Sequence, residues 1–397
     1  MLRTRREILE MAGLLAGLNK LKAAVKPVKV SGIDLFRIDI PVSPAEDKAG
    51  IEHRFNVVKI ATDAGVTGYS FAGPAPNALD RLKTILLGKD LFNIEELLRA
   101  GLMRDGSVEH AVWDAIGKIA GQPAYKLLSG RNDRMKAYVT CVWLGNADQS
   151  HVPPAEQVAQ AVRLRKAGFN GMKIRIWRPD PMDDVEVCRQ ILAANGKDFH
   201  LMVDRTAQMP VSMAGQKVWD FETGLRVARA LQEIGVYWLE EPFHRDDFDG
   251  PARLNRMVKI LITGGEGYST LDAYRECLVR GSYNILQPDP RQAGGILMCK
   301  KVATLAEAFH VTAIPHGYMG LTLAGWMQAG LAMNSPWQEI TMVRPPLVPE
   351  EQWAPGLKVL GSKQMYRFEN GEILAPPYAG IGLDIDEDAL NRYRTPA

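Results

Sequence analysis

The chain has 397 residues, of which 46% are hydrophobic and 24% are charged, and its formal net charge is +2. This length and composition are typical of a globular protein with a large core. The near-neutral charge argues against nucleic-acid binding, so we expect a small molecule as the partner. The four cysteines are widely separated and form no CxxC pair, which argues against a zinc site or a disulfide framework.

Residues 1–27 are predicted to be an N-terminal extension. Arg5 and Arg6 precede a weakly apolar stretch at 11–18, which resembles a twin-arginine export signal. Against export, Glu10 lies beside this stretch and no clear A-x-A cleavage site is present. A plain amphipathic helix is therefore an equally good interpretation of these residues. The location therefore stays open between the cytoplasm and export, and the stretch is too short to span a bilayer.

Residues 28–135 are predicted to form an α+β capping domain. The pattern from 28 to 73 alternates between apolar and polar residues, as antiparallel strands do. The polar segment 41–54 between two of these strands is long for a hairpin connection, so we expect a mobile loop there. Residues 79–128 then have apolar positions that recur at three and four, which predicts helices.

Residues 136–358 are predicted to form a closed barrel, because strands and helices alternate from residue 131 onward. Helices are expected at 155–167, 185–194, 224–234 and 271–280. An open doubly wound sheet would need a glycine-rich phosphate turn after the first strand, and none is present. The tail 359–397 is expected to return to the capping domain. The eight strands should end near Trp143, Arg175, Asp204, Glu240, Glu266, Asp289, His316 and Glu339.

Three acids mark a predicted metal site. Asp204, Glu240 and Glu266 each follow a short apolar run and are 36 and 26 residues apart, close to the roughly 30 residues of one strand–helix unit in a barrel of about 250 residues. Strand ends of a barrel converge on one face, and a cage of carboxylate oxygens suits Mg²⁺. Taken alone, Asp204 could instead be a helix N-cap, and Glu240 could belong to an exposed turn.

Two further pairs are candidates for chemistry on the same face. Lys173 and Arg175 are two apart on one strand, so their side chains point the same way, and we expect them in the barrel mouth. His316 follows the strand after Asp289. A carboxylate on one ring nitrogen would fix the tautomer and leave the other nitrogen to move a proton, so we interpret the pair as a base dyad. A lone histidine there is otherwise a satisfied hydrogen-bonding group.

From about residue 28 onward the chain resembles the mandelate racemase-like branch of the enolase superfamily. The motifs are 111–118 with 123–130, Val203-Asp204, Trp238-Leu239-Glu240-Glu241-Pro242, Gly265-Glu266, and Gln287-Pro288-Asp289 followed by Gly294-Gly295. The resemblance implies a modified TIM barrel, (β/α)₇β, under an α+β cap, and a homo-oligomer, either dimer or octamer. It also implies one Mg²⁺ held by Asp204, Glu240 and Glu266, which binds a substrate carboxylate and stabilises the enediolate left when the α-proton is removed.

The resemblance also implies roles for the other site residues. Lys173 would contact the substrate carboxylate, and Glu339, if protonated, would donate to an enediolate oxygen. Racemases of this branch carry a second lysine where this chain has Arg175, and a guanidinium is a poor base at neutral pH. His316 is then the one strong base, which suits β-elimination to a 2-keto-3-deoxy acid, with the imidazolium or Arg175 assisting the leaving hydroxide.

The motifs are most similar to the acid-sugar dehydratases, L-rhamnonate dehydratases among them. Thr206 stands where some of these enzymes carry a histidine, and the sugar would be selected by cap loops at 41–56 and 71–78. Two alternatives remain open: an isomerase of the same superfamily (racemase, epimerase or cycloisomerase), and a metal-containing barrel that binds a carboxylated ligand without turnover.

Overall fold

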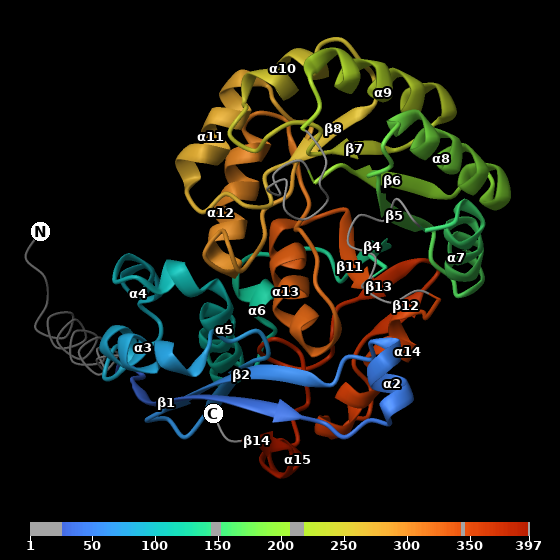
Figure 1. Ribbon diagram of the computed structural model, residues 1–397. Helices are drawn as coiled ribbons and strands as arrows, with labels where there is room; N and C mark the ends of the chain where they lie inside the picture. The colour runs from blue at the N-terminus through green and yellow to red at the C-terminus, as the bar shows by residue number, and fades with distance from the viewer. Residues whose placement is uncertain (1–25, 144–151, 207–217, 343–345, 396–397) are drawn as a thin grey trace, which may run out of the picture.

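An antiparallel sheet joins the two ends of the described chain. The structure is a computed structural model that describes residues 26–143, 152–206, 218–342 and 346–395 (Figure 1). The predicted export signal at Arg5 and Arg6 lies outside these residues. The sheet has the order β14–β1–β2–β3. Its strands are β1 (Val30–Asp39), β2 (Arg54–Thr62), β3 (Thr67–Ser70) and β14 (Arg394–Thr395).

One long helix covers a face of this sheet. Helix α5 (Gly106–Ala120) is buried over most of its length and packs on β2 and β3. The approach is close because Gly68 has no side chain: a Cβ there would lie 2.0 Å from the carbonyl oxygen of Ala111. The other helical segments of this region are η1 (Pro76–Ala78), α3 (Leu79–Leu86), α4 (Ile94–Arg99), η2 (Leu102–Asp105) and α6 (Ala124–Leu127).

The connection between β1 and β2 contains a helix, so the prediction of a loop over 41–54 is wrong in part. Helix α2 (Pro44–Ala49) begins at Ser43, whose hydroxyl accepts from the N–H of Glu46 while the Glu46 carboxylate accepts from the N–H of Ser43. Pro44 stands at the first helical position, where its fixed φ favours the helix. The sequence Ser43-Pro44-Ala45-Glu46 therefore forms a capping box at the start of α2.

Parallel strands form a closed barrel above the sheet (Figure 1). Within the described residues eight strands take part: β4 (Arg134–Cys141), β5 (Gly171–Arg175), β6 (His200–Asp204), β7 (Trp238–Glu240), β8 (Leu261–Gly264), β9 (Ile285–Leu286), β10 (Thr312–Ala313) and β11 (Trp337–Met342). β11 pairs in parallel with β4, and a bridge between Tyr318 and Ile340 joins β11 to the segment after β10.

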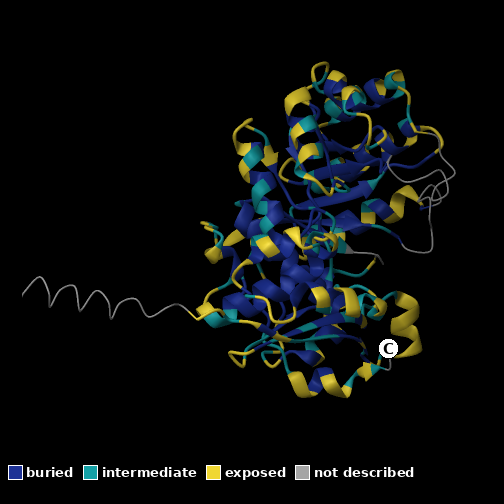
Figure 2. Cartoon of the chain, turned by 90° about the vertical axis from the view of Figure 1, so that its left-hand side faces the viewer, coloured by how far each residue is buried: buried dark blue, intermediate teal, exposed yellow. Residues whose placement is uncertain are grey.

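A helix follows each of the first seven of these strands. The strands of the barrel are largely buried (Figure 2). The chain thus folds as an α+β capping domain and a (β/α)₇β modified TIM barrel, which confirms the predicted fold class. The boundaries at 28–135, 136–358 and 359–397 stay predictions. The helices are α7 (Pro154–Lys166), α8 (Pro181–Asn195), α9 (Phe221–Ile234), α10 (Asp249–Asn255), α11 (Leu271–Arg280), α12 (Ile296–Glu307) and α13 (Leu323–Met333).

The segments after β11 contact both parts of the chain. The hairpin of β12 (Arg367–Glu369) and β13 (Glu372–Leu374) adds to the barrel through antiparallel pairing of β13 with β4. Strand β14 pairs with β1 in the cap sheet. The remaining segments are η3 (Gly320–Thr322), which precedes α13, and α14 (Pro349–Trp353), η4 (Ala354–Val359) and α15 (Glu387–Arg392). No helix in the described ranges combines the length and the apolar character needed to cross a membrane.

An apolar layer inside the barrel lies beneath the predicted site. Residues two apart on a strand point to the same side, and three strands repeat one pattern: Met202 precedes Asp204, Trp238 precedes Glu240, and Trp337 precedes Glu339. The apolar members form a buried cluster separate from the main core, with the rings of Tyr138 and Trp238 meeting edge to face at 5.2 Å. The cluster closes the barrel below the polar side chains and excludes water there.

A carboxylate of the cap holds a helix of the barrel. Glu109 on α5 accepts hydrogen bonds from the N–H groups of Ile296 and Leu297 at 2.8 and 3.0 Å, and from the indole of Trp113 at 2.7 Å. The first two donors are unpaired groups at the start of α12, so Glu109 caps a helix in another part of the fold. The glycine at the α12 N-cap, Gly295, is required because a Cβ there would lie 2.3 Å from the Glu109 carboxyl carbon.

We expect Glu109→Ala to lower the free energy of unfolding by about 1–3 kcal/mol, because buried N–H donors lose their acceptor. Chemical denaturation followed by circular dichroism measures the loss. Glu233→Ala, which removes an exposed glutamate from α9, is the control and should have little effect. Equal stability of the two variants would contradict the capping role.

Candidate active site

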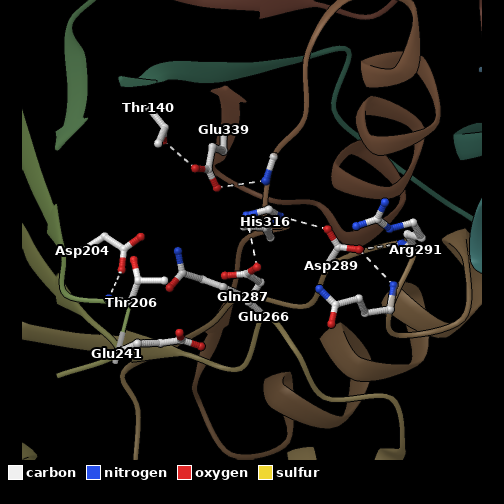
Figure 3. Close-up of polar contacts among 12 residues, drawn as sticks. Thr140, Asp204, Thr206, Glu241, Glu266, Gln287, Asp289, Arg291, His316 and Glu339 are labelled. Atoms are coloured by element: carbon white, nitrogen blue, oxygen red, sulfur yellow. Dashed lines mark hydrogen bonds and ion pairs between the residues drawn. The ribbon is translucent and has the colours of Figure 1, made fainter. Parts of the chain in front are cut away.

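His316 and Asp289 form a hydrogen-bonded pair at the mouth of the barrel (Figure 3). Nδ1 of His316 lies 2.9 Å from Oδ2 of Asp289. Oδ1 of Asp289 accepts from the N–H groups of Arg291 and Gln292. Burial alone would raise the pKa of Asp289, but the hydrogen bond and charge of His316, the N–H of Gln292 and the charge of Arg291 lower it. The ionised Asp289 therefore orients the ring so that Nδ1 donates and Nε2 faces the mouth.

The second ring nitrogen of His316 faces another carboxylate. Nε2 lies 3.6 Å from Oε1 of Glu266. Burial alone would lower the pKa of His316, but the charges of Glu266 and Glu339 and the hydrogen bond to Asp289 raise it to about 10. The largest raising influence is the charge of Glu266, so a cation near Glu266 would bring this pKa back toward the range of a general base.

Lys173 lies between two carboxylates inside the barrel. Its Nζ is 2.9 and 2.8 Å from the two oxygens of Glu240 and 3.0 Å from Oε1 of Glu339, and all three side chains are buried. Burial alone would lower the pKa of Lys173, but these two carboxylates raise it well above its ordinary value. The ammonium therefore stays charged, and its ion pairs link β5 with β7 and with β11.

Glu339 is an ionised acceptor in this arrangement. Oε1 accepts from the hydroxyl of Thr140 and from Lys173, and Oε2 accepts from the N–H of Gly317. Burial would raise the pKa of Glu339, but Lys173, His316 and Thr140 outweigh it and lower the pKa. The predicted donor role of a protonated Glu339 does not fit these contacts. Glu339 also lies inside β11 and not at its end.

Four acids crowd the ends of β6, β7 and β8. Asp204 and Glu240 are register partners on neighbouring strands, and Glu266 follows β8 by two residues. Glu241 lies beside them, with Oε1 3.4 Å from the Arg245 guanidinium. Burial first, and then the charges of Glu266, Asp204 and Glu240, raise the pKa of Glu241 well above its ordinary value. Negative charge therefore exceeds positive charge within this group.

Arg175 lies at the end of β5, three positions around the barrel from β10. Its Nε is 3.8 Å from Oδ2 of Asp204, and its guanidinium carbon is 5.1 Å from the ring centroid of Trp177. Lys173 and Arg175 thus both point into the barrel mouth, as their spacing predicts. Arg175 is tied to an acid of the predicted metal site and is separated from His316 by β4 and β11.

Two family matches cover most of the chain. Residues 38–129 match the mandelate racemase / muconate lactonizing enzyme N-terminal domain, and residues 156–389 match the enolase C-terminal domain-like family. The chain belongs to the mandelate racemase and muconate lactonizing enzyme branch of the enolase superfamily. This confirms the resemblance inferred from the motifs.

Relatives within this branch of the enolase superfamily include two dehydratases and an isomerase. The chain is 28% identical to an arabinonate dehydratase of Saccharolobus solfataricus, with 86% of this chain and 92% of the relative covered. It is 31% identical to a D-galactonate dehydratase of Ralstonia nicotianae, with coverages of 84% and 89%. It is 30% identical to a 3,6-anhydro-alpha-L-galactonate cycloisomerase of Streptomyces coelicolor, with coverages of 73% and 82%.

A solved structure of similar fold contains magnesium. It is a racemase from Streptomyces coelicolor A3(2) with bound magnesium, 26% identical, with a TM-score of 0.70 and coverages of 93% of this chain and 100% of that one. Enzymes of the enolase superfamily use Mg²⁺. In this chain, Asp204, Glu240 and Glu266 are the predicted ligands.

The donor set of this enolase-superfamily site fits a hard divalent cation. The acids supply only oxygen, as Mg²⁺ prefers. Burial first, and then the charges of neighbouring acids, raise the pKa of Glu240 and of Glu241. As the side chains stand, no three His, Cys, Asp or Glu residues of the described chain are close enough together to hold an ion. Both oxygens of Glu240 contact Lys173, and Oδ1 of Asp204 accepts from the N–H of Thr206. The assignment of the three ligands therefore stays a prediction.

We expect Glu240→Gln to weaken Mg²⁺ binding at least about tenfold, because a charged oxygen donor is replaced by a neutral amide. Isothermal titration calorimetry with MgCl₂ measures the affinity. Glu307→Gln, at the C-terminal end of α12, removes one exposed carboxylate as a control and should titrate normally. Normal titration of Glu240→Gln would show that Glu240 is not a ligand.

Two polar contacts of this site were not predicted. Thr140 on β4 donates to Glu339, and Gln287 donates to Oε2 of Glu240 at 2.9 Å. Gln287 stands in the quoted Gln287-Pro288-Asp289 motif, two residues before the dyad acid on the same strand end, and that spacing could have indicated it. Thr140 had no such signal, because a threonine in an apolar strand is common.

Proposed function

We propose that the chain is a Mg²⁺-dependent dehydratase of acid sugars, a hydro-lyase. The observation that carries this proposal is the contrast between the two sides of the barrel mouth. His316, oriented by Asp289 at 2.9 Å, has one ring nitrogen available for proton transfer. Arg175, where a second base would be needed for racemisation, is a guanidinium paired with Asp204. Among the described residues, one base of this kind faces a guanidinium, and that arrangement suits elimination better than exchange of a proton between two faces.

The residues have the following roles in this proposal. Asp204, Glu240 and Glu266 would hold Mg²⁺, which supplies the positive charge that makes an α-proton beside a carboxylate acidic enough for imidazole. Lys173 would add positive charge for the substrate carboxylate, while Glu339 keeps Lys173 charged and in place. Nε2 of His316 accepts the α-proton, and the bond between the β-carbon and its hydroxyl breaks.

Proton return completes the elimination. The imidazolium of His316 gives its proton to the departing oxygen, so that water leaves with the atoms in balance. The enol that remains becomes a 2-keto-3-deoxy acid. Arg175 can hydrogen-bond the departing oxygen from the other side of the mouth, since its guanidinium is half-buried and keeps donors free of Asp204.

The relatives support this class. Two of them act, by their names, on arabinonate and D-galactonate, and each matches more than four fifths of the chain. The second candidate is a cycloisomerase, which the 30% identity to a 3,6-anhydro-alpha-L-galactonate cycloisomerase favours. Both candidates need a base and an acid-sugar carboxylate, so sequence similarity alone does not separate them.

Incubating the protein with Mg²⁺ and a panel of acid sugars in D₂O separates the two candidates. The dehydratase is expected to form a keto acid, detected as its semicarbazone, together with one molecule of water per turnover. An isomerised product that takes up deuterium and yields no semicarbazone would overturn the proposal and favour the isomerase. The same assay with EDTA should abolish turnover in either case.

A further inference from the structure

A groove lies where the capping domain meets the barrel. Its volume is about 670 Å³, and sites for small molecules are commonly about 300–1,000 Å³. Residues of α4 and η2 form the wall on the side of the cap, and residues that follow β8 and β9 form the wall on the side of the barrel. Two arginines of the cap and one of the barrel line this groove: Arg99, Arg104 and Arg291.

No carboxylate balances these three charges within the groove, because none of the described residues that line it is acidic. The acids of α4 and η2 are paired with other cations: Asp105 with Arg81 at 2.7 Å, Glu95 with Lys301 at 2.5 Å and Glu96 with Lys89 at 3.9 Å. Over the part of the chain that the structure describes, none of the three groove arginines forms an ion pair. A cleft lined by charge of one sign concentrates ions of the opposite sign, so this groove attracts anions.

The two walls of the groove are held together by direct backbone contact. A Cβ at Gly106, the residue after η2, would lie 2.6 Å from the carbonyl oxygen of Arg291. A Cβ at Gly294, whose φ is +106°, would lie 3.2 Å from the carbonyl oxygen of Met103. Glycine at both positions lets the two backbones meet. The backbone of Arg104, next to Met103, is therefore fixed relative to that of Arg291, and a site built in this way needs little ordering when a ligand binds.

The barrel wall of the groove is also the turn that holds the base dyad. Oδ1 of Asp289 accepts from the N–H groups of Arg291 and Gln292 at 2.8 and 2.9 Å, while Oδ2 lies 2.9 Å from Nδ1 of His316 (Figure 3). The side chains of Arg291 and Gln292 line the groove. The groove therefore adjoins the candidate active site, but it contains none of the residues assigned to catalysis or to the metal.

We propose that this groove binds the phosphoryl group of a small ligand, either inorganic phosphate or a phosphate ester, through Arg99, Arg104 and Arg291. A guanidinium presents two parallel N–H donors that match phosphoryl oxygens, and a doubly charged anion can engage several guanidinium groups at once. Leu98 and Ser269 line the groove beside the arginines, so an ester would find both an apolar surface and a hydroxyl next to its phosphoryl group. This site is separate from the acid-sugar site and does not depend on the dehydratase activity.

Isothermal titration calorimetry of the whole chain in EDTA tests this site, with sodium phosphate, glycerol 3-phosphate and sodium acetate as separate titrants. About 0.1 M NaCl screens charges more than about 10 Å apart, so binding reports the groove and not the net charge of the protein. We expect both phosphoryl compounds to bind, and acetate to bind at least about tenfold more weakly. Arg99→Gln and Arg104→Gln should each weaken phosphoryl binding at least about fivefold, because each removes a charged hydrogen-bond donor at an exposed position.

Arg226→Gln is the matched control. Arg226 is an exposed arginine of α9 that does not line the groove, and this variant should bind phosphate as the wild-type protein does. Circular dichroism of the three variants should match that of the wild-type protein, because every substitution is on the surface.

The two phosphoryl titrants distinguish the two sources of the ligand. Tighter binding of glycerol 3-phosphate would support a phosphate ester, and equal or tighter binding of phosphate would support the inorganic ion. Absence of phosphoryl binding to the wild-type protein would overturn the inference. Equal affinities of the wild-type protein, Arg99→Gln and Arg104→Gln would also overturn it, and this is the result expected if phosphate binds at Lys173 or Arg175 in the barrel mouth instead.

Discussion

His316→Asn is expected to lower kcat by about 10²- to 10⁴-fold while the substrate and Mg²⁺ still bind, because general base catalysis contributes that much. The asparagine amide can still donate to Asp289 where Nδ1 of His316 lies 2.9 Å away, so the loop should keep its shape. Keto-acid formation gives the rate, and calorimetry with MgCl₂ gives the metal affinity.

A second histidine provides the control for this variant. His310 is exposed and precedes β10, at the end of that strand away from His316, with φ of +57°, a conformation that asparagine tolerates well. His310→Asn should have the wild-type rate. An unchanged rate in His316→Asn would remove the base dyad from the mechanism, whatever the reaction proves to be.

Lys173→Met is expected to destabilise the fold by about 3–5 kcal/mol, since it leaves buried carboxylates without their cation. Glu240 and Glu339 lie 2.8 and 3.0 Å from the ammonium, and Lys173 is 1% exposed. Methionine fills a similar volume, so the loss reports the charge and not a cavity. Chemical denaturation in EDTA, followed by tryptophan fluorescence, measures it without a contribution from bound metal.

Lys166→Met is the matched substitution at an exposed position of α7 and should change stability by less than about 0.5 kcal/mol. If Lys173→Met is as stable as this control, the ammonium does not hold the three strands together. The stability of the two variants should also be compared with Mg²⁺ present, because a bound ion can replace part of the lost positive charge.

The barrel elements could be predicted where local signals agree. Strands β5, β6 and β7 end at the charged residues Arg175, Asp204 and Glu240, as predicted. In each of them a charged residue follows an apolar run, and this change marks the end of the strand. Helix α11 has the predicted bounds, since Thr270 caps its start and Gly281, with φ of +70°, ends it. In contrast, the expected strand ends near Glu266, Asp289 and His316 lie two or three residues beyond β8, β9 and β10, in the loops that carry the site.

The site could be predicted as a set of residues but not as a set of contacts. The register of β6 and β7 brings Asp204 beside Glu240, and the dyad of His316 with Asp289 is in place. The partners of Lys173 could not be inferred, because they depend on distances across the barrel that sequence spacing does not contain.

The pairing of β14 with β1 has a consequence for synthesis of the chain. All of the barrel strands precede residue 394, so the barrel can close while the outer edge of the cap sheet is still bare. An unpaired edge strand is a template for association with other chains. A chain truncated before Arg394 would thus leave the outer edge of β1 unpaired, and we expect such a product to aggregate.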